Sequence, residues 1–381
     1  MNYRELGRMI KADGDAKTCQ HIKEAFEQGH IKADDFRSLR NLFEETVPDG
    51  REAVRYMDPR EQGSFVYKEA GDAVDTSVFQ NISGQIVYNM ILEASKHPAL
   101  VLSNLVKNIP TQFRSEKIPG ITGLGDENEV IGEGQEYPSA GLSDDYTETP
   151  LTYKRGRRVA VTKEAVFFDR IGLVLTQASE VGKYLAINKE KRLADCISDE
   201  NSTAHRYKWR GQVYGTFQGS TPWVNLKGSN GLVDWTDVDA ALQLLNNMTD
   251  PNTGEPMLMV ADTLLVCPEL EATAKRILNA TEVRHGDGAS NTVQTVSSNP
   301  VGSYGLVSSQ FLKTRMAVTT SWFLMDKSAV GYMENWPITV VQSPANSHND
   351  FHRDIVAEYK ASEMGAAVVL EPRKIVKSTV A

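Results

Sequence analysis

The C-terminal part of the chain contains two stretches, WFLMDKSAVGYMENWPITVVQ (322–342) and DIVAEYKASEMGAAVVL (354–370), that decide the fold class. They hold short runs of β-prone residues separated by turn residues, and each run predicts a strand: 322–326, 329–333, 338–342, 354–360 and 365–370. In the fourth run Ile355, Ala357 and Tyr359 alternate with their neighbours, which is the period of a strand that pairs antiparallel on a sheet face. No catalytic signature accompanies these strands, and this favours self-assembly over chemistry.

Several helices are predicted before this block. The longest runs from about 169 to 197, with Asp169 as its cap, and at 1.5 Å per residue it would be about 40 Å long. Apolar periodicity, capping residues and prolines predict four further elements: helices at 77–96 (ended by His97-Pro98), 236–248 (capped by Thr236) and 268–280 (opened by Pro268), and a strand at 263–267.

The first 60 residues predict short polar helices at 3–12, 16–28 and 34–45, each with one narrow apolar stripe. Such helices are marginal in water by themselves, so each needs a partner. Irregular or loop structure is predicted at 61–76, 200–233 and 284–299. Together with the strands, these elements predict an α+β protein.

The tract 118–152 is rich in glycine and acidic residues and is predicted to be a long two-stranded excursion. It returns as a strand at 153–161 (YKRGRRVAV) that carries four cations. A loop this long inside a compact domain is typical of a functional segment. We expect the acidic tract to meet the basic strand of a neighbouring copy, and the candidate contact residues are Arg114, Lys117, Asp126, Glu129, Glu133, Glu136, Lys154, Arg155, Arg157 and Arg158.

Composition limits the other possibilities. A chain of 381 residues with a net charge of −9 is a poor candidate for gripping nucleic acid over its whole surface. The three cysteines, Cys19, Cys196 and Cys267, have no metal-binding spacing, which favours reduced thiols in a cytoplasmic product. No apolar run is long enough to span a membrane, and the N-terminus lacks the apolar core of a signal peptide.

The chemical candidates are weak. His285-Gly-Asp-Gly288 lacks the Lys-Ser/Thr of a phosphate-binding loop, and no nucleophile elbow is present. Cys267 directly precedes a helix, where a thiolate would be favoured, but a core thiol at a strand end is the preferred interpretation. A polar turn is likewise preferred over a metal site for the cluster of His348, Asp350, His352 and Asp354. The sequence therefore predicts no enzyme, no metal and no cofactor.

The order of several segments resembles a known family. These segments are EVIGEGQEYP (129–138), YKRGRRVAVTKEAV (153–166), TLLVCPELEATAKRIL (263–278) and the C-terminal strand block. Together they resemble the major capsid proteins of tailed bacteriophages, which have the Hong Kong 97-like fold. The resemblance covers residues 77 to 377 approximately, and it rests on the order and spacing of these segments.

The resemblance implies a division of the chain into parts with known roles. It implies an N-terminal arm with helices, a peripheral domain with a long spine helix, an extended loop over the adjacent subunit, an axial domain, and return strands that complete both domains. The corresponding boundaries are 1–76, 77–112 with 159–233, 113–158, 234–320 and 321–381.

The resemblance also implies a function. The chain would self-assemble into pentamers and hexamers of an icosahedral head shell that encloses double-stranded DNA without sequence-specific binding. Portal, scaffolding or decoration proteins would be its other partners, with no membrane, and it would enter the virion after assembly in the host cytoplasm. Some family members cross-link a loop lysine to an asparagine with help from a glutamate. Lys117 and Glu363 are present, but Asp354 and Ile355 occupy the stretch of the asparagine, so no cross-link is predicted.

Three other interpretations stay open at this point. Within the same fold, an encapsulin-like compartment shell would hold cargo enzymes. From another class, a metal-dependent hydrolase would use the cluster at 348–354. A glycan-binding sandwich is weakened by the long helix. Contact with nucleic acid is the alternative use of the basic strand 154–158.

Overall fold

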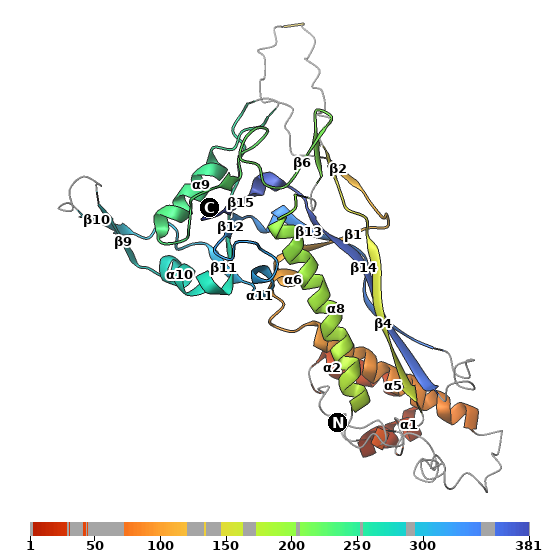
Figure 1. The fold of residues 1–381 in the computed structure, drawn as a ribbon. Coiled ribbons are helices and arrows are strands. Elements are labelled where there is room, and N and C mark those ends of the chain that lie inside the picture. The colour runs from red at the N-terminus through yellow and green to blue at the C-terminus, as the bar shows by residue number, and fades with distance from the viewer. Residues whose placement is uncertain are drawn as a thin grey trace. The chain divides into compact units, whose positions relative to one another are not determined.

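The computed structural model describes residues 3–28, 30, 41–42, 44, 72–119, 133–134, 146–162, 173–202, 206–251, 254–286, 294–343 and 355–380. The chain divides into two compact units (Figure 1). The first comprises Met1–Pro98, Lys154–Ile187 and Trp336–Met364, and the second comprises Ala99–Tyr153, Asn188–Asn335 and Gly365–Ala381. Helices and sheets occur together along the chain, which confirms the predicted α+β class.

The first unit contains the N-terminal helices α1 (Tyr3–Asp13), α2 (Asp15–Glu27) and α5 (Asp72–Ser95). Helices α1 and α2 join at Gly14, whose φ of 79° is in the left-handed region that favours glycine. Leu6 and Ile22 are fully buried, as expected for apolar stripes that need a partner. The predicted helices 3–12, 16–28 and 77–96 are therefore confirmed, with small shifts at their ends.

The predicted long helix is also confirmed, as α8 (Leu173–Ser198). In the first unit it packs very closely on α5: a Cβ added at Gly182 would lie 2.3 Å from the carbonyl oxygen of Ile91. Glycine is therefore the residue that allows this close approach. The predicted cap Asp169 is outside the described residues.

The C-terminal strands are longer than predicted. Runs 329–333 and 338–342 form one strand, β13 (Val330–Gln342), and runs 354–360 and 365–370 form another, β14 (Ile355–Val369). The prediction of four short strands was wrong because the polar residues between the runs do not turn the chain. Strands β13 and β14 are the central strands of a sheet with the order β1-β13-β14-β4, where β1 is Lys107–Pro110 and β4 is Tyr153–Thr162. The predicted return strand 153–161 is thus confirmed.

A five-stranded sheet lies at the centre of the second unit, in the order β11-β8-β12-β15-β7. Its strands are β7 (Leu226–Lys227), β8 (Thr263–Val266), β11 (Gly305–Ser308), β12 (Trp322–Met325) and β15 (Ile375–Ser378). Alternate residues of β12 belong to two different core clusters, with Trp322 and Leu324 in one and Phe323 and Met325 in the other. Burial on both faces explains why the sequence WFLM is apolar without interruption.

Helices and short elements complete the second unit. They are α6 (Val101–Leu105), α9 (Trp235–Asn246), α10 (Pro268–Leu278), α11 (Gln310–Lys313) and the 3-10 turns Lys327–Ala329 and Pro372–Lys374. The N-cap of α9 is Asp234 and not the predicted Thr236: the side chain of Asp234 accepts from the Thr236 N–H at 2.8 Å. Asp237 completes a capping box by accepting from the Asp234 N–H at 3.0 Å.

Two predicted irregular regions contain strands. The ends of the predicted loop 284–299 pair as the antiparallel ribbon β9 (Glu282–Gly286) and β10 (Gln294–Ser298). The region 200–233 contains β5 (Tyr207–Trp209), β6 (Gln212–Tyr214) and β7. Both predictions were wrong for these residues, because short strands in polar sequence have little periodicity to detect. Most of the predicted helix 34–45 and of the linker 61–76 lies outside the described residues.

Candidate assembly surface

The two legs of the predicted excursion are joined at their base. Strand β2 (Lys117–Pro119) pairs antiparallel with β3 (Tyr146–Glu148), with Ile118 opposite Thr147. Below this pair, the Thr149 N–H donates to the Glu116 carbonyl at 2.9 Å, and the Thr152 N–H donates to the Arg114 carbonyl at 2.9 Å. The middle of the tract lies outside the described residues apart from 133–134. Its two ends pair as a two-stranded excursion requires.

Side chains add to this base. The Glu116 N–H donates to Thr149 Oγ1 at 2.7 Å, and Ser115 Oγ donates to the Thr149 carbonyl at 2.8 Å. Asn335 Nδ2 donates to the carbonyls of Thr111 and Phe113 at 3.1 and 3.0 Å, which ties the chain before β2 to the middle of β13. The base is therefore fixed by hydrogen bonds before any neighbour binds, and a preorganised surface loses less entropy on association.

The base carries large apolar side chains in contact with water. Phe113 is 67% exposed, and Leu151 and Tyr153 on the other leg are about half exposed. The buried Thr152 lies between Leu151 and Tyr153, so exposure alternates along this leg as in a strand. Exposed aromatic side chains on a rigid support are typical of interaction surfaces.

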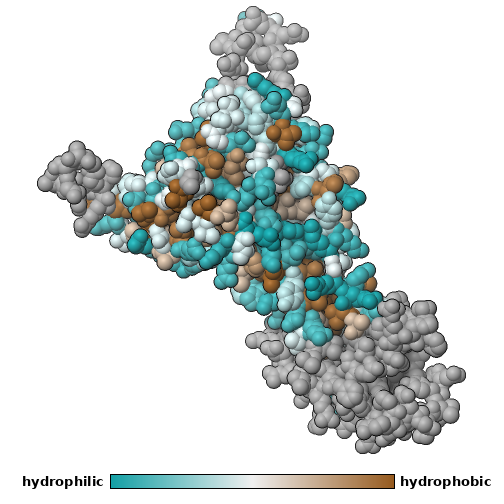
Figure 2. All heavy atoms as spheres, viewed as in Figure 1, coloured by the Kyte–Doolittle hydropathy of each residue, from teal (hydrophilic) through white to brown (hydrophobic). Residues whose placement is uncertain are grey.

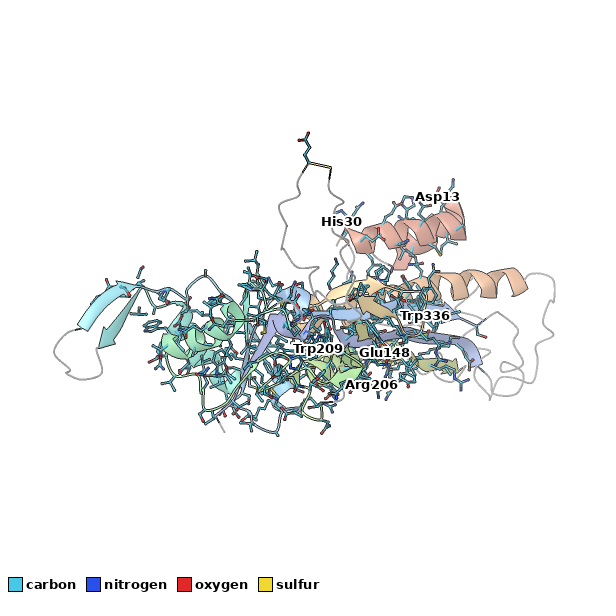
Figure 3. The ribbon with its side chains drawn as sticks, turned by 90° about the horizontal axis from the view of Figure 1, so that it is seen from above. Asp13, His30, Glu148, Arg206, Trp209 and Trp336 are labelled. Carbon is cyan, nitrogen blue, oxygen red and sulfur yellow. The ribbon has the colours of Figure 1, made fainter. Side chains whose placement is uncertain are left out.

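A cluster of charged and aromatic residues covers the small sheet β2-β3-β5-β6. Lys117 Nζ lies 4.7 Å from the centre of the Tyr146 ring, and Lys208 Nζ lies 5.2 Å from it. Lys208 also pairs with Glu148 at 3.2 Å. Hydrogen bonds from Lys208 to Tyr146 and to Glu148 raise the pKa of Lys208. Figure 3 labels Glu148, Arg206 and Trp209. Arg206 directly precedes β5, and Trp209 is the last residue of β5.

The basic side chains of β4 contact residues of their own chain in the first unit. Arg158 Nη1 lies 3.3 Å from Glu358 Oε1 on β14. The Arg157 guanidinium lies 5.9 Å from the centre of the Tyr184 ring, and Lys154 Nζ lies 5.9 Å from the Trp336 ring. These contacts hold the cations in place on the strand, and all three side chains stay exposed to water.

The structure places only some of the predicted contact residues. Arg114, Lys117, Glu133, Lys154, Arg157 and Arg158 are exposed, Arg155 is half-buried, and Asp126, Glu129 and Glu136 lie outside the described residues. Contact between the acidic tract and the basic strand of another copy thus stays a prediction. Sequence reasoning missed Asn335, Thr149 and Phe113, because nothing in their local sequence indicates partners far along the chain.

The candidates for chemistry have ordinary structural roles where the structure describes them. Cys267 is fully buried, and burial raises the pKa of its thiol to about 11, which supports its assignment as a core thiol. Burial also raises the pKa of Cys196. The predicted cluster at 348–354 lies outside the described residues, and no group of metal-binding side chains occurs in the rest. None of the described helices has the length and apolar character to cross a membrane.

Several solved structures resemble this chain at low sequence identity. The virus-like particle from Pyrococcus furiosus is 10% identical, covering 77% of this chain and 98% of that chain, with a TM-score of 0.42. The capsid of the cyanophage P-SCSP1u is 14% identical over 72% and 85%, with a TM-score of 0.45. The encapsulin complex from Synechococcus elongatus is 14% identical over 74% and 88%, with a TM-score of 0.42. No curated protein matches the chain.

The family comparison is decisive. The family described as phage capsid protein matches residues 146–378, which is more than half of the 381 residues. The match extends from β3 at the base of the excursion to β15 in the central sheet. It confirms the resemblance to phage capsid proteins, and the chain belongs to the phage capsid protein family.

Proposed function

We propose that this chain is the major capsid protein of a tailed phage, and that it self-assembles into pentamers and hexamers of an icosahedral head shell around double-stranded DNA. Its membership of the capsid family supports a role as a structural shell protein. The observation that carries the rest is the rigid base of the excursion, which presents exposed Phe113, Leu151 and Tyr153. Such a surface suits a neighbouring copy better than a small substrate.

The excursion would act as a strap that lies on the adjacent subunit. The stretch 126–136 contains five carboxylates and no cation, whereas 154–158 contains four cations and no carboxylate. Opposite charges of this kind orient two subunits as they approach and disfavour incorrect pairings between them. Each exposed ion pair contributes only about 0–1 kcal/mol, so the shell depends on summed apolar burial and on the many copies that bind together.

The parts of the chain follow from this proposal. Residues 234–320 would form most of the axial domain, α8 would be the spine of the peripheral domain, and 1–76 would be the N-terminal arm. Assembly would take place in the host cytoplasm with portal, scaffolding or decoration proteins, and the product would be the virion shell. The DNA would be enclosed without sequence-specific binding, since the net charge of −9 disfavours contact with phosphates over the whole surface.

Electron microscopy and analytical ultracentrifugation of the purified protein test the assembly. We expect closed icosahedral shells with pentameric and hexameric rings. A protein that remains a single-chain species at high concentration would overturn the proposal. Closed shells that enclose a co-expressed enzyme instead of nuclease-protected DNA would favour the compartment shell.

Charge reversal tests the strap. We expect Arg157→Glu to remove most shells while the subunit stays folded, because Arg157 is exposed and its ring contact with Tyr184 contributes little. Reversal of the tract in the same chain, with Glu129→Lys and Glu133→Lys, should restore assembly. Lys96→Glu places the same change at another exposed site in the first unit and serves as the control. Normal shells from Arg157→Glu would contradict the strap.

A further inference from the structure

The small sheet β2-β3-β5-β6 of the second unit has one apolar face and one charged face. Thr147, Tyr207 and Trp209 are buried, and the two aromatic residues belong to the core cluster under the sheet. Lys208 lies between Tyr207 and Trp209 on β5, so its side chain is on the opposite face. The sheet is therefore a platform that the core fixes from below and that meets water with its other face.

The strand register places charged residues next to each other on this outer face. Lys117 lies opposite Glu148. The Glu148 N–H donates to the Arg206 carbonyl at 3.1 Å, which continues the pairing to Arg206 (Figure 3). In the next row Tyr146 lies opposite Lys208. Lys117 and Arg206 thus flank Glu148 from the two neighbouring chain segments.

Positive charge exceeds negative charge on the outer face. We call its charged residues the basic face: Lys117, Glu148, Arg206, Lys208 and Arg210, the last in the turn between β5 and β6. Four cations and one carboxylate give this face a net charge of +3, in a chain whose net charge is −9. Lys208 pairs with Glu148, whereas the other three cations form no ion pair among the described residues.

Aromatic rings hold several of these cations in place without neutralising them. Lys117 Nζ and Lys208 Nζ lie 4.7 and 5.2 Å from the centre of the Tyr146 ring, and the Arg210 guanidinium lies 4.6 Å from the centre of the Trp209 ring. Such contacts restrict a long side chain and leave its charge unpaired. Less conformational entropy is then lost when an anion binds.

The composition of the basic face favours nucleic acid over another protein as its partner. The exposed aliphatic side chain on this face is that of Val213, opposite Lys208. Figure 2 shows mostly hydrophilic residues over the part of the second unit where Figure 1 labels β2 and β6. The centres of protein–protein contacts are depleted of charged residues, whereas protein–DNA contacts are polar and strongly positive.

We propose that the basic face binds the phosphate backbone of the enclosed DNA. This inference rests on the proposed function, which supplies the duplex, and it names the surface of the subunit that contacts the duplex. Lys117, Arg206 and Arg210 would each neutralise a phosphate and release condensed counterions, and such contacts carry no base specificity. The rest of the chain is acidic, which confines the contact to this patch.

Binding of duplex DNA to the dissociated subunit tests the contact. Fluorescence anisotropy of a fluorescein-labelled duplex of mixed sequence is measured over a series of salt concentrations. Three neutralised phosphates predict a slope of about −2.7 for the logarithm of the binding constant against the logarithm of the salt concentration. Arg206→Gln with Arg210→Gln should weaken binding at low salt by roughly tenfold or more and should change the slope to about −1.

The matched control removes two exposed cations elsewhere in the second unit, with Lys107→Gln and Arg276→Gln. This pair changes the net charge by the same amount and should leave the affinity and the slope close to those of the wild type. Equal losses from the two double variants would show that only the net charge matters, and this would overturn the inference. A wild-type subunit without measurable affinity for the duplex at low salt would also overturn it.

Glu148→Gln gives a measurement in the opposite direction. Removal of this carboxylate leaves Lys208 available for a fourth phosphate, so binding should tighten several-fold and the slope should become steeper by about one. A residue that only supports the pairing of β3 with its neighbours would not strengthen DNA binding when it is replaced. Unchanged or weaker binding by the folded Glu148→Gln subunit, with folding checked by circular dichroism, contradicts the proposal.

Shell assembly separates this inference from the proposed function. Without DNA, the variant with Arg206→Gln and Arg210→Gln should form shells as well as the control pair does, as judged by electron microscopy. Loss of shells from this variant alone would show that another copy covers the basic face, and the inference would be wrong. Wild-type shells whose subunits bind no DNA contradict the inference alone, whereas a wild-type chain that never assembles contradicts the proposed function.

Discussion

Arg158 and Glu358 form an ion pair within one chain, with 3.3 Å between Arg158 Nη1 and Glu358 Oε1. The arginine side chain is half exposed, whereas the glutamate is nearly buried on β14. A nearly buried carboxylate depends on its cation more than an exposed one does. Arg158 therefore has a structural role in β4–β14 packing that its exposure alone does not indicate.

This pair divides the two adjacent arginines into different roles. We expect Arg158→Glu to lower the free energy of unfolding by about 1–2 kcal/mol, because it places a second carboxylate beside Glu358. Arg157→Glu should change it by less than about 0.5 kcal/mol. Urea unfolding of the dissociated subunit measures both. Equal stability of the two variants would show that the ion pair contributes nothing. Because Arg158 also stabilises its own subunit, reversing Arg157 alone is a sharper test of the strap than reversing Arg157 and Arg158 together.

Glu190 on α8 caps the short helix α6 from outside that helix. Its buried carboxylate accepts from the N–H groups of Leu102 and Ser103, at 2.6 and 2.9 Å, and from Ser103 Oγ at 2.7 Å. The N-cap residue of α6 is Leu100, which has no side chain that can do this. Glu190→Ala leaves three donors without an acceptor, and we expect a loss of about 2–4 kcal/mol.

Glu190→Gln keeps one acceptor oxygen and is the matched comparison. This variant should lose less free energy of unfolding than Glu190→Ala. It still loses some, because the NH2 group of glutamine is a donor and faces another donor. Thermal and urea unfolding of the dissociated subunit measure both losses. Identical stability of the alanine variant and the wild type would refute the cap.

The contact of Gly182 with Ile91 predicts a steric effect. A Cβ at 2.3 Å from the Ile91 carbonyl oxygen requires α8 and α5 to move apart, so Gly182→Ala should destabilise the first unit despite the better helix propensity of alanine. We expect a loss of about 2 kcal/mol or more. Gly228→Ala, where the added Cβ meets no atom within 4 Å, should be neutral. Circular dichroism melting compares the two, and equal melting temperatures would contradict the close crossing.

The three thiols should differ in reactivity. Burial raises the pKa of Cys267 to about 11 and also raises that of Cys196, so both should resist iodoacetamide at pH 8, while the partly exposed Cys19 reacts first. The folded state holds these thiols in the protonated form. For Cys267 this contribution to stability is complete below the ordinary thiol pKa near 9 and is lost as the pH rises through about 11. Mass spectrometry after timed alkylation shows the order, and rapid labelling of Cys267 in the folded chain would contradict its burial.

Much of the local structure follows from local sequence. The helix at 268–280 was predicted from Pro268 and its apolar face, and α10 spans Pro268–Leu278. The strand 322–326 was predicted from four consecutive apolar residues, and β12 spans Trp322–Met325. These elements are predictable because capping, proline geometry and apolar periodicity act within a few residues of each other.

Strand length was less predictable, and β13 shows why. Pro337 lies inside this strand and suggests a break, because proline has no N–H for a ladder. The neighbouring strand β1 ends at Pro110, opposite Glu334. Beyond that point β1 no longer pairs with β13. Proline is tolerated where no ladder hydrogen bond is needed. The sequence of β13 does not contain the end of β1, so only the tertiary structure shows this.

The candidate surface divides in the same way. The α+β class, the long helix, the charged tract and the basic strand could be predicted from local sequence, because composition and periodicity are properties of neighbouring residues. The tertiary structure was needed to show that Asn335 ties the loop base and that Glu358 pairs with Arg158. These features depend on which distant segments meet. Their hydrogen bonds join residues that lie far apart in the chain, so the local sequence of one residue does not indicate its partner.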